Sequence, residues 1–255
     1  MSLRRSIAAV SYLNTIPFIY GIEHAGLLRA DLLLAPPADN VASFAAGDAD
    51  IALVPVGALP HIPEHKIVTS CCLGADGTVR TVVITGNRPV EQTCRLWLDS
   101  HSRTSVLLGR VLCAELWGIS PEYRHLDDCS VMDDPADGDA FLLIGDKVFT
   151  AEGRFAHTYD LASCWKRMTG QPFVFAVWVA RPEVDDDTVD ALQRSLEYGL
   201  AHIPEAIELY GYGDKPYAYE YLTRNIDFIL DRRKREALTL FAEKARHFDP
   251  GSRHG

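Results

Sequence analysis

Residues 94–117, CRLWLDSHSRTSVLLGRVLCAELW, contain the change from strand to helix from which we interpret the rest of the chain. The apolar run Cys94–Leu98 predicts a β-strand, and the polar residues Asp99-Ser100-His101 predict a turn. Apolar residues then recur at helical spacing as far as Trp117, which predicts a helix that begins at Ser102. A strand that leads through a polar turn into a helix is typical of α/β proteins, whose ligands bind at the carboxyl edge of the sheet.

The start of this predicted helix is a candidate anion-binding site. Ser102, Thr104 and Ser105 carry hydroxyls at or just after the N-cap, and Arg103 lies among them. Backbone N–H groups in a first turn have no partner within the helix, and the helix dipole adds partial positive charge. Such donors suit a carboxylate or a phosphate. The alternative is a plain helix cap with a surface arginine, although a cap needs one hydroxyl rather than three.

Two predicted strands in the first quarter of the chain also end in candidate residues. The apolar strand Ser6–Val10 leads to Ser11 and Asn14, ahead of a helix with a proline in its first turn. A later apolar strand, Asp50–Val54, leads to Pro55-Val56. Because parallel strands end at the same edge of a sheet, we expect these residues to line a pocket there. For Asn14, helix capping is an equally good alternative.

Two further strands add candidate residues from the middle of the chain. The apolar strand Phe141–Ile144 ends at Gly145 and Asp146, and Thr81 lies in Thr78–Thr85, the most β-rich run of the sequence. Asp146 is a candidate general base, although a Gly-Asp turn more often has a structural role. The one other obvious proton carrier at these turns is His101, and a histidine in such a position is more often a turn residue than a base.

The order of strands and helices predicts the fold class and the domain organisation. Two long β runs, Thr78–Thr85 and Phe173–Ala180, bracket an αβ block in the middle of the chain. This pattern predicts an α/β fold of two lobes with a ligand cleft between them. We expect residues 1–86 together with 176–255 to form one discontinuous lobe, and residues 87–175 to form the other.

Composition and motifs exclude several classes of partner. The chain has 255 residues and a formal net charge of −10, which argues against nucleic acid or an anionic membrane as the main partner. The sequence lacks a transmembrane-length apolar run and a signal peptide, so we expect a cytoplasmic protein. The six cysteines have no metal-ligand spacing, and no nucleotide-binding or metalloprotease motif is present, so we expect no cofactor and no metal. The oligomeric state stays open between monomer and homodimer.

Several of these segments are sequence blocks that occur in one order along the chain. The blocks are VSYLNTIP at 10–17, DIALVP at 50–55, SRTS at 102–105, LIGD at 143–146, YDLA at 159–162, and Trp165 with TGQPFVFA at 169–176. Together they resemble the futalosine-pathway menaquinone biosynthesis family. The SRTS, IGD and W-x-x-x-T-G-x-P-F-V-F-A blocks are similar to its chorismate dehydratase branch rather than to its dihydroxynaphthoate synthase branch. Two departures, Thr81 for a frequent serine and Ala162 for a usual glycine, remove no polar group.

The resemblance implies a periplasmic-binding-protein-like (type II) fold that works as an enzyme without a cofactor. It implies loss of water from chorismate, an anionic small molecule, to give 3-enolpyruvylbenzoate. The family's active-site asparagine corresponds to Asn14, which would orient the ring or its leaving hydroxyl. On this hypothesis the SRTS hydroxyls bind one carboxylate and Thr81 binds the other, while Arg103 faces the ligand or braces the loop. The base is Asp146 or a carboxylate of the substrate itself.

Two other functions fit the same sequence. A solute-binding protein for a small carboxylate would share the fold without any reaction. The sister 1,4-dihydroxy-6-naphthoate synthase would act on a later intermediate of the same route. A transcriptional effector domain is a weaker alternative, because no helix-turn-helix segment is apparent in the sequence.

Overall fold

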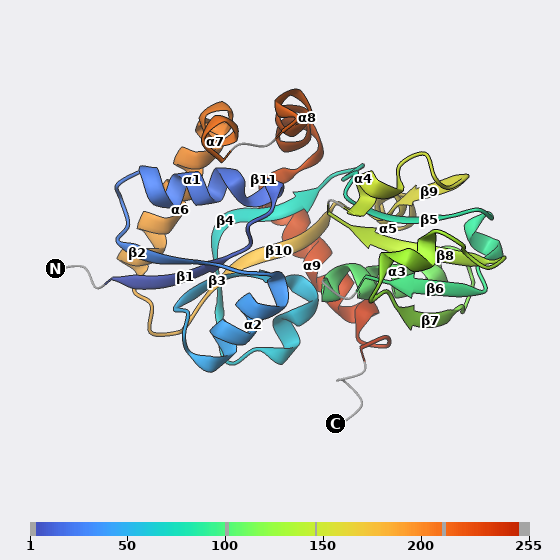
Figure 1. Ribbon diagram of the computed structural model, residues 1–255. Coiled ribbons are helices and arrows are strands. Elements are labelled where there is room, and N and C mark those ends of the chain that lie inside the picture. The colour runs from blue at the N-terminus through green and yellow to red at the C-terminus, as the bar shows by residue number, and fades with distance from the viewer. Residues whose placement is uncertain (1–3, 100–101, 146, 211–212, 250–255) are drawn as a thin grey trace. The chain divides into compact units, whose positions relative to one another are not determined.

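The computed structural model divides into two compact α/β units (Figure 1). The structure describes four stretches of the chain, namely residues 4–99, 102–145, 147–210 and 213–249. The units are made of Met1–Gly74 with Val174–Arg232, and of Ala75–Phe173 with Arg233–Gly255. Each unit has its own mixed β-sheet. Within the described stretches, no helix is both long and apolar enough to cross a bilayer.

The first unit is built on a six-stranded sheet in the order β11-β4-β10-β3-β1-β2. Its strands are β1 (Arg5–Ala9), β2 (Ala30–Leu34), β3 (Ile51–Pro55), β4 (Lys66–Ala75), β10 (Phe173–Ala180) and β11 (Asp227–Ile229). β1 pairs in parallel with β2 and β3, whereas β10 runs antiparallel to β3. The helical segments are η1 (Leu13–Thr15), α1 (Ile16–His24), α2 (Pro37–Ala46), η2 (Val56–His61), α6 (Asp186–Ala201), α7 (Ile203–Tyr210), α8 (Lys215–Glu220) and the π-helical turn η5 (Tyr221–Asn225).

Close helix packing stabilises this unit beside the sheet. The backbones of α1 and α6 approach so closely that a Cβ on Gly21 would lie 1.9 Å from the carbonyl oxygen of Ser195. A Cβ on Gly199 would lie 1.8 Å from the carbonyl oxygen of Pro17, so both positions require glycine. The ring of Phe18, on the same helix α1, packs edge-on against Trp178 at a centroid distance of 5.8 Å. This packing fixes the start of α1, and with it the turn that precedes the helix.

The second unit is built on a five-stranded sheet in the order β7-β6-β8-β5-β9. Its strands are β5 (Val82–Gly86), β6 (Arg95–Leu98), β7 (Glu122–His125), β8 (Asp139–Ile144) and β9 (His157–Asp160). β6 runs parallel to β7 and β8, and β5 runs antiparallel to β8 and β9. The helical segments are η3 (Val90–Gln92), α3 (Arg103–Glu115), η4 (Cys129–Met132), α4 (Lys147–Ala151), α5 (Leu161–Thr169) and α9 (Arg232–Ala245).

The structure confirms the predicted α/β class but differs from the predicted boundaries. The chain enters the second unit at Ala75, ahead of β5, because β5 pairs with β8 and β9 of that unit. Residues 233–255 also belong to the second unit, since Phe241 of α9 packs on Trp165 and Phe173 at centroid distances of 5.9 and 5.0 Å. The predicted strand Thr78–Thr85 is also wrong at its start, because β5 begins only at Val82.

Candidate functional site

The candidate residues of the first unit follow β1 and β3 at one edge of the sheet. These strands are parallel neighbours, with Ile7 opposite Ile51, so their carboxyl ends lie side by side. Ser11 after β1 is exposed, whereas Pro55 and Val56 at the end of β3 are buried. The prediction that these segments share an edge is therefore confirmed, while their contact with a ligand stays a prediction.

Asn14 lies in the short turn η1, which Thr15 holds in place. The Thr15 side chain is fully buried. Its hydroxyl lies within hydrogen-bond distance of the carbonyl oxygens of Val10 and Tyr12, at 2.7 Å from the latter. The hydroxyl oxygen also accepts the Tyr12 N–H at 3.2 Å. Since both ends of the turn are tied to one buried side chain, Asn14 is presented from a fixed backbone.

The Asn14 side chain has an unsatisfied polar atom. Its Oδ1 is buried, and no group among the described residues donates a hydrogen bond to it. The N-cap positions of η1 and α1 are Tyr12 and Thr15, so the alternative that Asn14 caps a helix is wrong. A buried acceptor without a hydrogen-bond partner lowers the free energy of unfolding by about 1–3 kcal/mol. Such an atom therefore needs an explanation, and binding of a ligand is one. The Oδ1 of Asn14 is thus suited to accept a hydrogen bond from a donor group of a ligand, such as a hydroxyl.

The candidate residues of the second unit meet at the edge where β8 ends and β5 begins. Val82 of β5 pairs with Ile144 of β8, and the Gly145 N–H donates to the Thr81 carbonyl oxygen at 2.8 Å. Gly145 has a φ of +58°, a left-handed conformation that favours glycine. The structure therefore brings Thr81 and Gly145 together. Asp146, like Ser100 and His101, lies outside the described residues.

The hydroxyls at the start of α3 serve the helix cap more than the sequence suggested. Ser102 is the N-cap, and its Oγ accepts the Ser105 N–H at 3.3 Å and the Ser105 hydroxyl at 3.0 Å. Thr104 and Ser105 are buried. β6, which leads into α3, lies beside β8, so this helix start is at the same sheet edge as Gly145. Its N–H groups and dipole keep the capacity to bind an anion, and that binding stays a prediction.

Arg103 braces the start of α3. Its guanidinium forms an ion pair with Asp249, a carboxylate with 7% of its side chain exposed, from the segment after α9. Of the two predicted roles for Arg103, these contacts support bracing rather than binding of substrate. The pair also fastens the last described residues of the chain to the second unit.

A buried ion pair at this edge was not predicted from the sequence. Asp99, the first residue after β6, is fully buried, and the Nζ of Lys147 lies 2.9 Å from its Oδ2. Lys147 begins α4, two residues after Gly145. The pair brings a cationic side chain to the loops that carry the candidate residues. The sequence places both residues directly beside predicted turns, but no local sequence pattern indicates that they pair across the sheet.

Asp160 is a second residue that the sequence did not place in a role. Its carboxylate accepts the backbone N–H groups of Val79 and Arg80 at 3.0 and 2.7 Å and caps α5 through the Ser163 N–H at 2.9 Å. Burial raises the pKa of Asp160, and these three N–H donors oppose the rise. Arg80 has a φ of +68°, so Asp160 holds a strained turn directly before Thr81.

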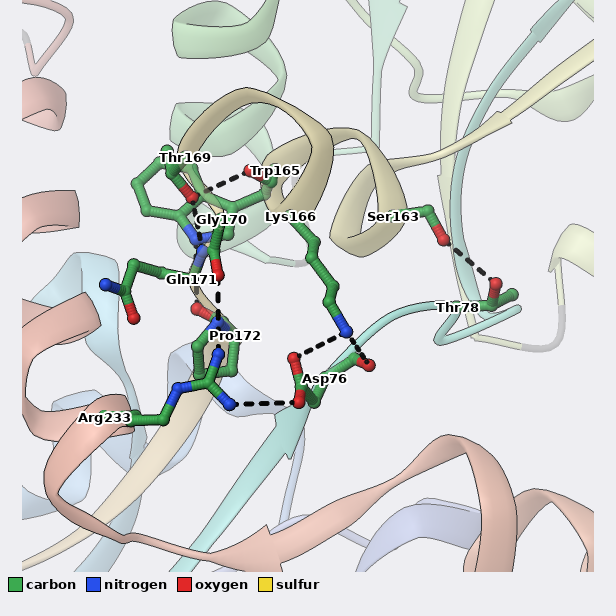
Figure 2. A network of polar contacts seen from close by, with 10 residues as sticks. All are labelled: Asp76, Thr78, Ser163, Trp165, Lys166, Thr169, Gly170, Gln171, Pro172 and Arg233. Atoms are coloured by element: carbon green, nitrogen blue, oxygen red, sulfur yellow. Dashed lines mark hydrogen bonds and ion pairs between the residues drawn. The ribbon is translucent and has the colours of Figure 1, made fainter.

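The block around Trp165 has a structural role (Figure 2). Trp165 donates its ring N–H to the Pro172 carbonyl oxygen at 3.0 Å, and Gly170 ends α5 with a φ of +72°. Lys166 and Arg233 lie 3.0 and 3.4 Å from the two carboxylate oxygens of Asp76. The hydrogen bond from Lys166 is the main reason why the pKa of Asp76 is lowered. These contacts tie α5, α9 and the segment directly after β4 together within the second unit.

The described residues contain no group of three or more histidine, cysteine or acidic side chains arranged to hold a metal ion. Three titratable groups beside these turns, Asp99, Lys147 and Asp160, each have a partner in the structure. The edges are therefore rich in neutral donors and acceptors and in helix N-termini. Such groups can bind and orient an anion or a hydroxyl compound.

The two α/β units with mixed sheets match solved structures of the periplasmic-binding-protein-like fold. A protein from Archaeoglobus fulgidus superposes with a TM-score of 0.75 at 16% identity, covering 96% of this chain and 97% of that one. A Candida albicans protein, described as having the generic periplasmic binding protein fold, gives a TM-score of 0.63 at 15% identity over 95% and 91% of the two chains. The predicted fold class is confirmed.

The chain belongs to the menaquinone biosynthesis family, whose family model matches residues 5–247. Among curated relatives, it is similar to the chorismate dehydratase of Thermus thermophilus. The two are 26% identical over 254 residues, covering 91% of this chain and 92% of the relative. The family identified from the sequence blocks is thus confirmed.

Proposed function

We propose that this protein is a chorismate dehydratase, which converts chorismate to 3-enolpyruvylbenzoate and water in the futalosine route to menaquinone. The observation that carries the proposal is the buried Oδ1 of Asn14, which has no hydrogen-bond partner in the part of the chain that the structure describes and belongs to the first sequence block of the family. Family membership and the relative from Thermus thermophilus support the same reaction.

The reaction asks little of an enzyme in the way of charged groups. A ring C–H bond and a ring C–OH bond break, the C–H electron pair becomes a ring double bond, and the proton and hydroxide leave as water. The ring becomes aromatic, which supplies the driving force. The enzyme has to hold a dianion, orient the leaving hydroxyl and assist one proton transfer, which positioning and neutral hydrogen bonds can accomplish.

Each candidate residue has a role in this proposal. The Oδ1 of Asn14 accepts a hydrogen bond from the ring hydroxyl and so orients the leaving group. The N-terminus of α3, capped by Ser102, binds one carboxylate through backbone N–H groups, and the turn at Thr81 and Gly145 binds the other acidic arm. Ser11, Pro55 and Val56 shape the edge beside Asn14. The proton acceptor is either Asp146 or a carboxylate of the substrate.

The test is incubation of purified protein with chorismate, followed by ring absorbance and mass spectrometry of the product. Conversion to an aromatic product that has lost one water supports the proposal. Binding without turnover would favour a solute receptor, and inert chorismate with consumption of a later cyclised intermediate would favour the sister synthase. Asp146→Asn then separates the two bases, because retained turnover points to proton removal by the substrate's own carboxylate.

A further inference from the structure

The segment 27–33, which includes the start of the edge strand β2 (Ala30–Leu34) of the first unit, has an unusual sequence symmetry. β2 is the last strand in the sheet order, and within the described stretches its one strand partner is β1 (Figure 1). Residues 27–33 read LLRADLL, so the same residue types occur on both sides of Ala30, with Arg29 on one side and Asp31 on the other. A segment with this symmetry is complementary to itself when two copies run antiparallel.

Three leucines on this edge strand and directly before it are exposed. Leu27, Leu33 and Leu34 have 43%, 39% and 46% of their surface exposed. Natural proteins protect edge strands with charges, prolines or covering segments, because an open apolar edge pairs with other chains. Here the leucines flank one cation and one anion, Arg29 and Asp31, and both of these are exposed. The edge therefore combines apolar area with complementary charge.

The backbone hydrogen bonds of β2 show which residues have free groups on this edge. The Arg29 carbonyl oxygen accepts the Arg5 N–H, and the Ala35 N–H donates to the Ala9 carbonyl oxygen, both at 3.1 Å. In a parallel pair the residues that bond to the neighbour alternate along the strand. The odd-numbered residues of β2 therefore face β1. Within the strand, Ala30 and Leu32 direct their N–H and C=O groups to the open edge, and Leu28 and Arg29 lie directly before the strand.

These two patterns agree in register. We propose that β2 is an interface for a second copy of this chain, paired antiparallel about a two-fold axis at Ala30. Ala30 then exchanges both backbone hydrogen bonds with Ala30 of the other copy, as an antiparallel hydrogen-bonded pair requires. The proposed pairing extends the strand by the two residues before Ala30, so that Leu28 pairs with Leu32 in the same way and Arg29 lies directly opposite Asp31. If the register of the two copies shifted by one residue, Arg29 would no longer lie opposite Asp31, and the backbone groups of the two strands would no longer match.

The ends of β2 limit the pairing to this segment. Pro36 and Pro37 follow the strand and lack an N–H group, and Gly26 before it has a φ of +66°, which is not extended. The paired segment is therefore short, and it is smaller than the roughly 800 Å² per partner of a standard interface. We expect a dimer that forms with rising concentration rather than an obligate one. The interface does not depend on the proposed function.

The test is sedimentation velocity of the full chain over a concentration series from about 1 to about 100 µM. The wild type is expected to move from monomer towards dimer in this range. Arg29→Asp and Asp31→Arg each place two like-charge pairs across the axis and are expected to raise the dissociation constant about tenfold. The double variant, Arg29→Asp with Asp31→Arg, restores both pairs and is expected to return within about threefold of the wild type.

The controls separate pairing in this register from a general effect of charge. The two single variants change the net charge in opposite directions, so a general charge effect cannot weaken both. Asp31 also forms an exposed ion pair with Arg4 of its own chain, so Arg29→Asp is the cleaner single variant. Arg194→Asp makes the same change at an exposed position of α6 and is expected to leave the dimer unaffected. A wild type that sediments as a monomer throughout, a double variant as weak as the single ones, or an equal effect of Arg194→Asp would overturn the proposal.

A covalent test reads the register directly. In a hydrogen-bonded antiparallel pair the Cα atoms of opposite residues are about 5.5 Å apart, which a disulfide can span. Ala30→Cys is therefore expected to give a disulfide-linked dimer on mild oxidation, above the background from the native thiols. Leu33→Cys is the matched control, because its opposite residue is Leu27. Equal cross-linking of both variants, or of neither, would contradict the two-fold axis at Ala30.

Discussion

Replacement of Asn14 by alanine is expected to change stability and activity in opposite directions. The Oδ1 atom of Asn14 is buried without a hydrogen-bond partner among the described residues. Such an atom lowers the free energy of unfolding by about 1–3 kcal/mol relative to a site without it. Because Asn14 is only half-buried, we take the lower end and expect Asn14→Ala to raise this free energy by about 1 kcal/mol. For a chain of this size that is an increase in Tm of about 2–4 °C.

Turnover of chorismate is expected to fall strongly in the same variant. If Asn14 holds the leaving hydroxyl, its removal costs roughly 100-fold in kcat, in line with the loss of one oriented polar group from an active site. The assays are differential scanning fluorimetry and initial rates of formation of the aromatic product. A residue with only a structural role would lose activity and stability together.

Two further variants sharpen this test. Asn87→Ala changes an exposed asparagine in the turn after β5, so Tm and kcat are expected to stay within error of the wild type. Asn14→Asp keeps the size of the side chain but adds a negative charge, which is expected to lower Tm and to repel a dianionic substrate. A drop in Tm for Asn14→Ala of more than a few degrees, or turnover near that of the wild type, would refute the reasoning.

Three more predictions concern single contacts. Ser102→Asp keeps a good N-cap on α3, so Tm is expected to hold while the added charge raises KM at least about tenfold; Ser102→Ala is the matched variant, with a Tm loss from the weaker cap and a smaller rise in KM. Asp160→Ala removes the acceptor of three backbone N–H groups and is expected to lower the free energy of unfolding by about 2–4 kcal/mol in denaturant titrations; an unchanged midpoint would contradict this. Asp185 accepts the Thr188 N–H at 2.8 Å, the main reason why its pKa is lowered from 3.8 to about 2. A carboxyl whose pKa is lower in the folded state stabilises the fold at pH values above its unfolded-state pKa, and this stabilisation is lost as the pH falls through its folded-state pKa. Asp185→Asn is therefore expected to flatten the decrease in Tm between pH 4 and pH 2. Parallel curves of Tm against pH for variant and wild type would argue against this role.

Local patterns predicted the parts of the fold that depend on local physics. The periodicity of residues 94–117 predicted β6 and α3 with Ser102 as the N-cap, and the structure has both. The run Thr78–Thr85 shows where such patterns fail. Its β-branched residues favour a strand, but the Asp160 carboxylate, 81 residues after Val79, binds the N–H groups of Val79 and Arg80 and turns the chain.

The unit boundaries were wrong for a similar reason. The amphipathic pattern of α9 shows that one face is buried, but it does not show against which sheet. Phe241 packs on Trp165 and Phe173, so α9 belongs to the second unit. The sequence does not distinguish the two roles of the Ser102 and Ser105 hydroxyls, because a helix cap and an anion site use the same residue types. Coordinates were needed to see that the two hydroxyls bond to each other.

The sequence blocks that identify the family differ in what they can say about the reaction. The block from Trp165 to Pro172 ends α5 at Gly170 and ties the helix to the segment that follows through the Trp165–Pro172 hydrogen bond. These contacts would suit a solute receptor as well as an enzyme. The first block is different. Its Thr15 hydroxyl bonds to both ends of the turn, whereas the buried Oδ1 of its Asn14 has no partner among the residues described and so has a stability cost. Since natural sequences break local rules mainly at functional positions, Asn14 is the residue at which a receptor and a dehydratase should differ most in their response to mutation.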